Sequence, residues 1–159
     1  PQLTVRHVRG KNPFRIIVDS KLRIPIKSSV LTDANACLTI IATTSAAPAA
    51  KIAAVKKRGV EVCVVRKERD GRVGLRDLLK QLGKREIMSV LIEGGSEIIT
   101  SLLKSGLVDK MIIPIAPMIV GKGLEAIGDL NINKINKAIR FTSFKTMKKG
   151  DDIIFEGTM

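Results

Sequence analysis

The residues best suited to chemistry in this sequence are a carboxylate followed by two glycines, Glu93-Gly94-Gly95. A short apolar run, Val90 to Ile92, precedes them, and apolar residues at helical spacing follow between Ile98 and Leu103. The pattern predicts a buried strand, a glycine turn and a helix, an arrangement that aims backbone N–H groups at an anion. Glycine has no side chain and therefore lets a phosphate approach the backbone. Glu93 stands at the carboxyl end of the expected strand, where open α/β sheets bind ligands.

Two interpretations of this stretch are open. In the first, Glu93 faces a polar substrate beside a phosphate-binding turn, as in a reductase or a transferase. In the second, the stretch is an ordinary strand-to-helix turn in which Ser96 caps the helix and Glu93 is solvated. A Gly-Gly pair is a much weaker signal than a full phosphate-loop signature, so the stretch alone does not decide between them.

The rest of the chain must position this turn, and its periodicity predicts alternating strands and helices. Polar residues follow two of the expected strands, as Asp19-Ser20 and Thr43-Thr44-Ser45, and they also fall where a ligand would bind. The alternation indicates an α/β fold with a mostly parallel sheet, helices on both faces and a C-terminal antiparallel hairpin. Pro114 suggests a bulge or an edge position for its strand. The expected strands are 14–18, 38–42, 60–65, 90–92, 111–116, 139–147 and 153–158, and the expected helices are 49–57, 75–82 and the segment after Gly95.

Composition narrows the classes of function. The chain has 159 residues, 45% of them hydrophobic, and is predicted to fold as one domain, residues 1–159, with a substantial core. Its 28 Lys and Arg against 15 Asp and Glu give a net charge of +13, which favours phosphorylated metabolites, dinucleotides or nucleic acid as partners. The basic residues are scattered, and Trp and Tyr are absent. This pattern argues against a nucleic-acid groove with a stacking platform.

Cysteine and histidine usage argues against a metal site. Cys37 and Cys63 stand far apart in apolar surroundings, and the single histidine, His7, receives no catalytic role. Two buried thiols are typical of a reducing compartment, so a cytoplasmic protein is expected. No apolar run approaches transmembrane length, and no membrane association is expected. Near the N-terminus, Arg6 and Arg9 are candidate phosphate ligands, although on sequence alone a surface charge is the favoured interpretation of both.

A series of short motifs spans the chain in one order: Pro1-Gln2-Leu3-Thr4-Val5-Arg6, Asn12-Pro13, Val18-Asp19-Ser20, Leu22-Arg23-Ile24-Pro25, Ala42-Thr43-Thr44, Glu93-Gly94-Gly95, Gly106-Leu107-Val108-Asp109, and Ala116-Pro117 near a glycine loop. Together the motifs resemble the reductase of riboflavin biosynthesis, the 5-amino-6-(5-phosphoribosylamino)uracil reductase family. In many bacteria this reductase is the C-terminal domain of a bifunctional deaminase/reductase, and in archaea it stands alone. The resemblance covers essentially the whole chain and rests on the set, since no single motif would suffice.

The resemblance implies a dihydrofolate-reductase-like fold, NADPH as cofactor, and reduction of the phosphoribosylamino group of a pyrimidine intermediate to a ribitylamino group. Carried over by position, Leu3, Arg6 and Glu93 would contact substrate, Arg6 through its 5-phosphate, and Ser20 would contact NADPH. The resemblance assigns the cofactor's phosphates to a turn and helix start formed by Gly95, Ser96, Glu97, Ile98, Ile99, Thr100 and Ser101. No residue is assigned as catalytic, because the cofactor performs the hydride transfer.

The resemblance also implies partners: a phosphorylated pyrimidine substrate, a second copy of the chain in a homodimer and, in a bifunctional parent, a deaminase domain upstream. The family begins with a further segment before the position of Pro1, and residues 1–159 are expected to lack it. Two other classes stay open, a non-catalytic nucleotide-binding module of similar fold and a nucleic-acid-binding domain. NADPH consumption would identify the reductase, and steep salt dependence of DNA binding would identify the last class.

Overall fold

The computed structural model describes the chain except residues 1–2, 6 and 8 and the side chain of Cys37. The residues divide into two compact units, Pro1–Met88 and Ser89–Met159. Within the described residues, no helix is long and apolar enough to cross a bilayer. In chain order the helices and strands are β1 (Arg15–Val18), β2 (Thr39–Thr43), α1 (Ala49–Lys56), β3 (Glu61–Val64), α2 (Leu75–Gly83), α3 (Ser96–Lys104), β4 (Lys110–Ile115), β5 (Ser143–Lys149) and β6 (Asp152–Thr158), with short 3₁₀ turns at Ser29–Leu31, Ala36–Leu38 and Ile135–Lys137.

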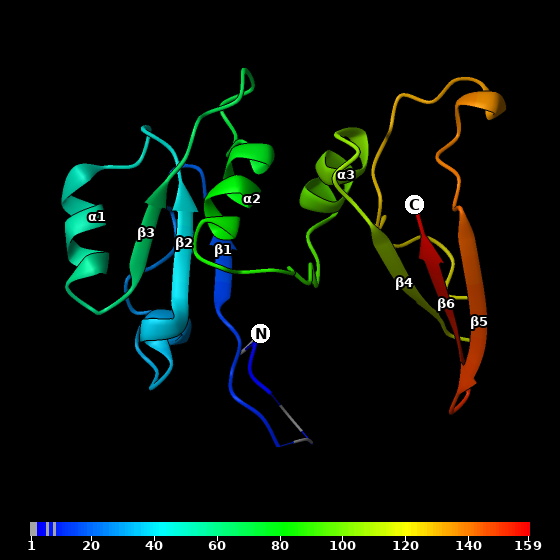
Figure 1. Cartoon of the computed structure of the whole chain (residues 1–159), viewed down its shortest axis with the longest axis horizontal. Coiled ribbons are helices and arrows are strands. Elements are labelled where there is room, and N and C mark those ends of the chain that lie inside the picture. The colour runs from blue at the N-terminus through cyan, green and yellow to red at the C-terminus, as the bar shows by residue number, and fades with distance from the viewer. Residues whose placement is uncertain (1–2, 6, 8) are drawn as a thin grey trace. The chain divides into compact units, whose positions relative to one another are not determined.

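The first unit is built on a parallel three-stranded sheet in the order β1-β2-β3 (Figure 1). Ile41 of the central strand pairs with Val62, and both pack with Val55 of α1 in the main apolar core. Cys63 follows Val62 in β3 and therefore points to the opposite face. There its thiol donates a hydrogen bond of 3.0 Å to the side-chain oxygen of Gln81 in α2. The parallel sheet thus has a helix on each face, which confirms the predicted arrangement.

Most predicted elements of the first unit form within a residue or two of their expected ends. All five residues of β2 are buried, as expected of a central parallel strand. Helix α2 buries Leu78 and Leu82, which lie on one face at helical spacing. The first strand differs from its prediction. Phe14, expected to be buried, is 49% exposed, whereas Arg15 is only 1% exposed.

Arg15 can be buried because its guanidinium is paired in several directions. Its Nη1 donates to Oδ2 of Asp33 at 2.7 Å, and its Nη2 donates to Oδ1 at 2.9 Å. The Nε donates to the hydroxyl of Thr39 at 3.0 Å, and Nη2 also donates to the carbonyl of Val30 at 3.0 Å. A buried charge is tolerated when it is paired and hydrogen-bonded in this way. The hydrogen bond from Arg15 is also the main cause of a lowered pKa at Asp33.

The second unit contains α3 and an antiparallel sheet in the order β4-β6-β5 (Figure 1). Strands β5 and β6 form the predicted terminal hairpin, which turns at Gly150 with a φ of +63°. Strand β4 pairs with β6, with Pro114 opposite Ile154. Pro114 therefore lies on an edge strand, one of the two positions predicted for it. The sheet is less parallel than expected, because the strand predicted at 111–116 pairs with the hairpin and not with a parallel neighbour.

The prediction of a buried strand at Val90–Ile92 is wrong. Residues 87–95 form neither helix nor strand, and Leu91 and Ile92 are 77% and 38% exposed. A strand needs a hydrogen-bonded neighbour, and this segment pairs with none of the described strands. Its β-branched residues supply strand propensity only, and propensity does not replace pairing. An irregular segment therefore leads into the glycine turn.

Candidate functional site

The glycine turn has the backbone geometry that only glycine adopts readily. Gly94 and Gly95 have φ angles of +149° and +87°, both in the region that L side chains rarely occupy. Gly95 is the N-terminal cap of α3, and its carbonyl accepts from the N–H groups of Ile98 and Ile99 at 2.9 and 3.1 Å. The cap position is held by Gly95, so the Ser96 cap of the second interpretation is wrong, whereas Glu93 is exposed, as that interpretation expected. The helix begins with first-turn N–H groups that no capping side chain uses, which is the arrangement that binds anions.

The backbone conformation explains why glycine occupies positions 94 and 95, since a side chain would have room at both. A Cβ placed on Gly94 would have no atom within 4 Å, and one placed on Gly95 would lie 3.8 Å from Cδ1 of Ile98. Both glycines are exposed, so their backbone is open to a ligand. Glu93 immediately before them is also exposed. A solvent-facing carboxylate beside an open turn suits a polar substrate group.

Two hydroxyls of α3, both among the expected cofactor residues, bond to the helix backbone. Thr100 Oγ1 donates to the carbonyl of Ser96 at 2.6 Å, and Ser101 Oγ donates to the carbonyl of Glu97 at 2.7 Å. Thr100 is 9% exposed, and its hydroxyl also accepts the backbone N–H of Gly128 at 2.8 Å. A Cβ on Gly128 would lie 3.3 Å from that hydroxyl oxygen and 3.8 Å from Oγ of Ser96. Gly128 thus packs against the first turns of α3. The sequence does not indicate this contact, because Gly128 is there recognisable only as the end of a loop.

Ser20 lies at the carboxyl edge of the parallel sheet, directly after β1. Its hydroxyl oxygen accepts the backbone N–H of Val73 at 3.1 Å, and its carbonyl accepts the hydroxyls of Thr43 and Thr44 at 3.2 and 2.8 Å. Both threonines are fully buried. Their hydroxyls, expected at a ligand-binding edge, instead hold the backbone of Ser20 in place. The Ser20 hydroxyl keeps its own proton and can still donate to a ligand.

The expected site residues are distributed over both compact units. Leu3 and Ser20 belong to the first unit, and Glu93 and Gly95–Ser101 belong to the second. Leu3 is half-buried with a φ of +51°, a conformation that is unusual for a branched side chain. Arg6, the expected phosphate ligand, lies outside the described residues.

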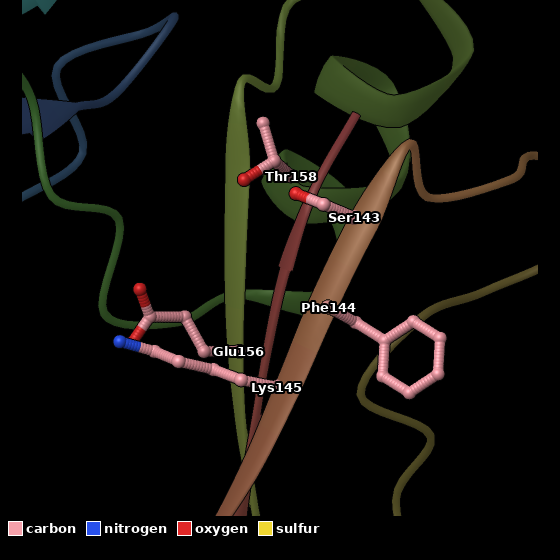
Figure 2. Close-up of a pocket in the computed structure, with 5 residues that line it drawn as sticks. All are labelled: Ser143, Phe144, Lys145, Glu156 and Thr158. Carbon is pink, nitrogen blue, oxygen red and sulfur yellow. The ribbon is translucent and has the colours of Figure 1, made fainter.

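A shallow depression of about 180 Å³ lies on the terminal hairpin and includes none of the expected site residues. Figure 2 shows Lys145 and Glu156 pointing toward each other on one side of the hairpin, while Phe144 points to the other side. Glu156 is paired with Lys145 at 3.3 Å and with Lys110 at 2.9 Å, and the hydrogen bond from Lys110 is the main cause of its lowered pKa. The carboxylate in this depression is therefore already engaged by two lysines.

Comparison with known proteins places the chain in one family. The family model described as the RibD C-terminal domain matches residues 1–155. The chain is 36% identical over 155 residues to the riboflavin biosynthesis protein RibD of Aquifex aeolicus, which covers 97% of this chain and 41% of that protein. It is 38% identical over 165 residues to the 2,5-diamino-6-ribosylamino-4(3H)-pyrimidinone 5′-phosphate reductase of Methanothermobacter thermautotrophicus, covering 100% of this chain and 73% of that protein. The chain therefore spans less than half the length of the Aquifex relative.

A solved structure shows the same fold. The diaminohydroxyphosphoribosylaminopyrimidine deaminase/5-amino-6-(5-phosphoribosylamino)uracil reductase of Thermotoga maritima superposes with a TM-score of 0.74 at 25% identity, over 99% of this chain and 41% of that one. The superposition confirms the expected dihydrofolate-reductase-like α/β fold of riboflavin-pathway reductases. With a family match over residues 1–155, the chain belongs to the RibD C-terminal domain family.

Proposed function

We propose that this chain is the reductase part of a riboflavin-biosynthesis enzyme. In the proposed reaction, NADPH reduces the phosphoribosylamino side chain of a pyrimidine intermediate to a ribitylamino group. The observation that carries the proposal is the family match over residues 1–155. The names of the relatives support it, because the Methanothermobacter protein is a pyrimidinone 5′-phosphate reductase and the Thermotoga protein is a deaminase/reductase.

The glycine turn fits the phosphates of a nicotinamide dinucleotide. Gly94 and Gly95 leave the backbone open, and the start of α3, whose cap residue Gly95 has no side chain, supplies the positive end of a helix dipole. Ser96 would contribute through its backbone N–H group in the first turn. In the first unit, Ser20, which the family resemblance assigns to NADPH, keeps its hydroxyl proton to donate, because its oxygen accepts the N–H of Val73. When bound, the cofactor supplies the hydride, and these residues hold and orient it.

The substrate would be held by Leu3, Arg6 and Glu93. Arg6 offers the guanidinium fork that suits a phosphate group. Glu93 is exposed and can accept hydrogen bonds from the hydroxyls or amino groups of a phosphoribosylamino pyrimidine. In this proposal Glu93 orients the substrate and does not transfer a proton.

Turnover with defined substrates tests the proposal. Purified full-length protein is mixed with NADPH and either the diaminopyrimidinone or the aminouracil form of the phosphoribosylamino compound. We expect loss of reduced-nicotinamide absorbance and a product two hydrogens heavier by mass spectrometry. The alternative, a non-catalytic nucleotide-binding module, would bind NADPH without oxidising it in the presence of either compound. Comparison of the two compounds also identifies the substrate form.

Three further properties belong to this proposal. The enzyme would work in the cytoplasm, where its substrate and NADPH are made. It would form a homodimer, which light scattering at several concentrations can test. The parent polypeptide would carry a deaminase domain upstream if it is of the bifunctional type, as in the Thermotoga protein.

A further inference from the structure

A short basic hairpin, residues 66–73, leaves the carboxyl end of β3 beside Ser20. Lys67 and Val73 form an antiparallel bridge, and the N–H of Glu68 donates to the carbonyl of Arg72 at 2.8 Å. The turn is closed by the N–H of Gly71, which donates to the carbonyl of Glu68 at 2.9 Å. Backbone hydrogen bonds therefore fix the shape of this basic hairpin, in contrast to a loosely solvated run of charges.

The basic hairpin is also attached to the sheet and to α2 at its base. The N–H of Val73 donates to the hydroxyl oxygen of Ser20 at 3.1 Å, and the N–H of Arg66 donates to Oδ2 of Asp77 at 2.9 Å. The second bond is the main cause of a lowered pKa at Asp77. Gly74 closes the base with a bond of 2.8 Å from its N–H to the carbonyl of Arg66, and a Cβ on Gly74 would lie 2.8 Å from that oxygen. A larger residue would push the two arms apart.

This rigid element carries an excess of positive charge. Its cations are Arg66, Lys67, Arg69 and Arg72, and its acids are Glu68 and Asp70. Asp70 pairs within the basic hairpin. Its Oδ2 lies 3.6 Å from Nε of Arg72, and its Oδ1 accepts the backbone N–H of Arg72. Lys67 and Arg69 are exposed and form no ion pair with any residue that the structure describes. They are the charges that a ligand at this edge would meet.

We propose that the basic hairpin binds a phosphate monoester, namely the 2′-phosphate that distinguishes NADPH from NADH. The inference rests on the proposed function, because it takes Ser20 as a cofactor residue. Ser20 keeps a proton to donate, and the basic hairpin bonded to it brings Lys67 and Arg69 to the same edge of the sheet. Ligands of open α/β sheets bind at this carboxyl edge, and a nearby cation is the usual means of accommodating the 2′-phosphate. The phosphorylated sugar of the substrate is the other source of the same chemistry.

The test compares one double variant with a matched control in the full-length protein. The variant Lys67→Gln/Arg69→Gln removes two charges from the basic hairpin. The control Lys57→Gln/Arg58→Gln removes two exposed charges just before β3, at the opposite, amino edge of the sheet. Calorimetry measures binding of three compounds: adenosine 2′,5′-bisphosphate, adenosine 5′-monophosphate and the phosphorylated pyrimidine. The two adenosine compounds are the probes, none of the three measurements requires turnover, and circular dichroism confirms that each variant is folded.

We expect the basic-hairpin variant to lose about tenfold or more in affinity for the bisphosphate, since charge-assisted hydrogen bonds are lost. Affinity for the monophosphate should stay within about twofold, and the control should bind both probes like the unchanged protein. An unchanged bisphosphate affinity, or an equal loss for both probes, would overturn the assignment. So would a loss confined to the phosphorylated pyrimidine, which would assign the phosphate to the substrate. A protein that discriminates between the probes but never oxidises NADPH would refute the proposed reaction and leave the phosphate site intact.

Discussion

The backbone N–H of Gly128 donates a hydrogen bond of 2.8 Å to the hydroxyl oxygen of Thr100, and that hydroxyl donates to the carbonyl of Ser96 at 2.6 Å. One buried side chain thus joins the loop that ends near Gly128 to the first turn of α3. The hydroxyl has a single proton, which is already given to Ser96. In our proposal, Thr100 therefore serves the cofactor site by positioning its surroundings, and it has no proton left for a phosphate oxygen.

Thr100→Val should weaken NADPH binding indirectly. Valine keeps the shape of threonine but leaves the N–H of Gly128 without its acceptor, at a cost of about 1–3 kcal/mol. We expect a lower melting temperature and a several-fold higher Kd for NADPH, measured by fluorescence titration. Thr32→Val is the matched control, because the Thr32 hydroxyl also donates to carbonyls three and four residues earlier, those of Ser29 and Ser28, and Thr32 is not among the expected cofactor residues. Equal effects of the two substitutions would show that the loop contact is unimportant.

Gly95→Val should impair the glycine turn itself. At a φ of +87° a β-branched residue is a conformational outlier, so the turn must change shape and the start of α3 must move with it. We expect NADPH affinity to fall at least tenfold, as expected when several phosphate contacts are lost. Gly59→Val is the control, because Gly59 has a φ of +79° with nothing within 4 Å of a Cβ and lies after α1 in the other unit. NADPH affinity that falls equally in both variants would mean that general destabilisation is responsible.

The parts of the fold that depend on local pattern could be predicted from the sequence. Leu78 and Leu82 share one face of α2 because apolar side chains recur at helical spacing, and β2 is buried along its whole length because its residues form an unbroken apolar run flanked by threonines. The glycine turn was also predictable, since two adjacent glycines after an apolar run indicate positive φ angles. These features need no knowledge of distant neighbours.

Features that depend on partners far apart in the sequence could not be predicted. Arg15 is buried because its guanidinium donates hydrogen bonds to Asp33 and Thr39. The spacing of apolar residues in the sequence does not predict that pairing. Leu91 is exposed although its neighbours favour a strand, because no described strand pairs with it. The bond between Gly128 and Thr100 joins residues 28 positions apart. Tertiary contacts decided each of these cases against local propensity.

Arg6→Ala should affect the substrate and spare the cofactor. If Arg6 holds the substrate phosphate, its loss removes a charge-assisted contact of about 1.5–3 kcal/mol, which corresponds to a rise of roughly ten- to a hundredfold in the apparent KM for the phosphorylated pyrimidine. The KM for NADPH should change little. Steady-state kinetics with each reactant varied in turn measure both values. Arg9→Ala, an exposed arginine three residues later, serves as the control. A rise in the KM for NADPH would instead assign Arg6 to the cofactor.

Asp33→Asn should destabilise the first unit in a pH-dependent way. The hydrogen bond from Arg15 lowers the pKa of Asp33 in the folded protein, while the unfolded chain keeps the ordinary value. Folding therefore favours the ionised carboxylate. Its stabilisation is fully present above the ordinary pKa of an aspartate and is lost as the pH falls through the lowered value. The substitution also leaves the buried guanidinium of Arg15 without its charge partner.

Urea unfolding of the parent protein and of Asp33→Asn across a pH series checks this prediction. At neutral pH the variant should unfold at a clearly lower urea concentration than the parent protein. The difference between the two unfolding midpoints should narrow as the pH falls, because a protonated aspartate in the parent protein no longer forms an ion pair with Arg15. Asp70→Asn is the control. Its ion pair with Arg72 is 3.6 Å long, with both side chains more than half exposed, so it should change the midpoint little at any pH. A gap that stays constant from neutral to strongly acidic pH would show that the charge of Asp33 contributes nothing to the stability of this unit.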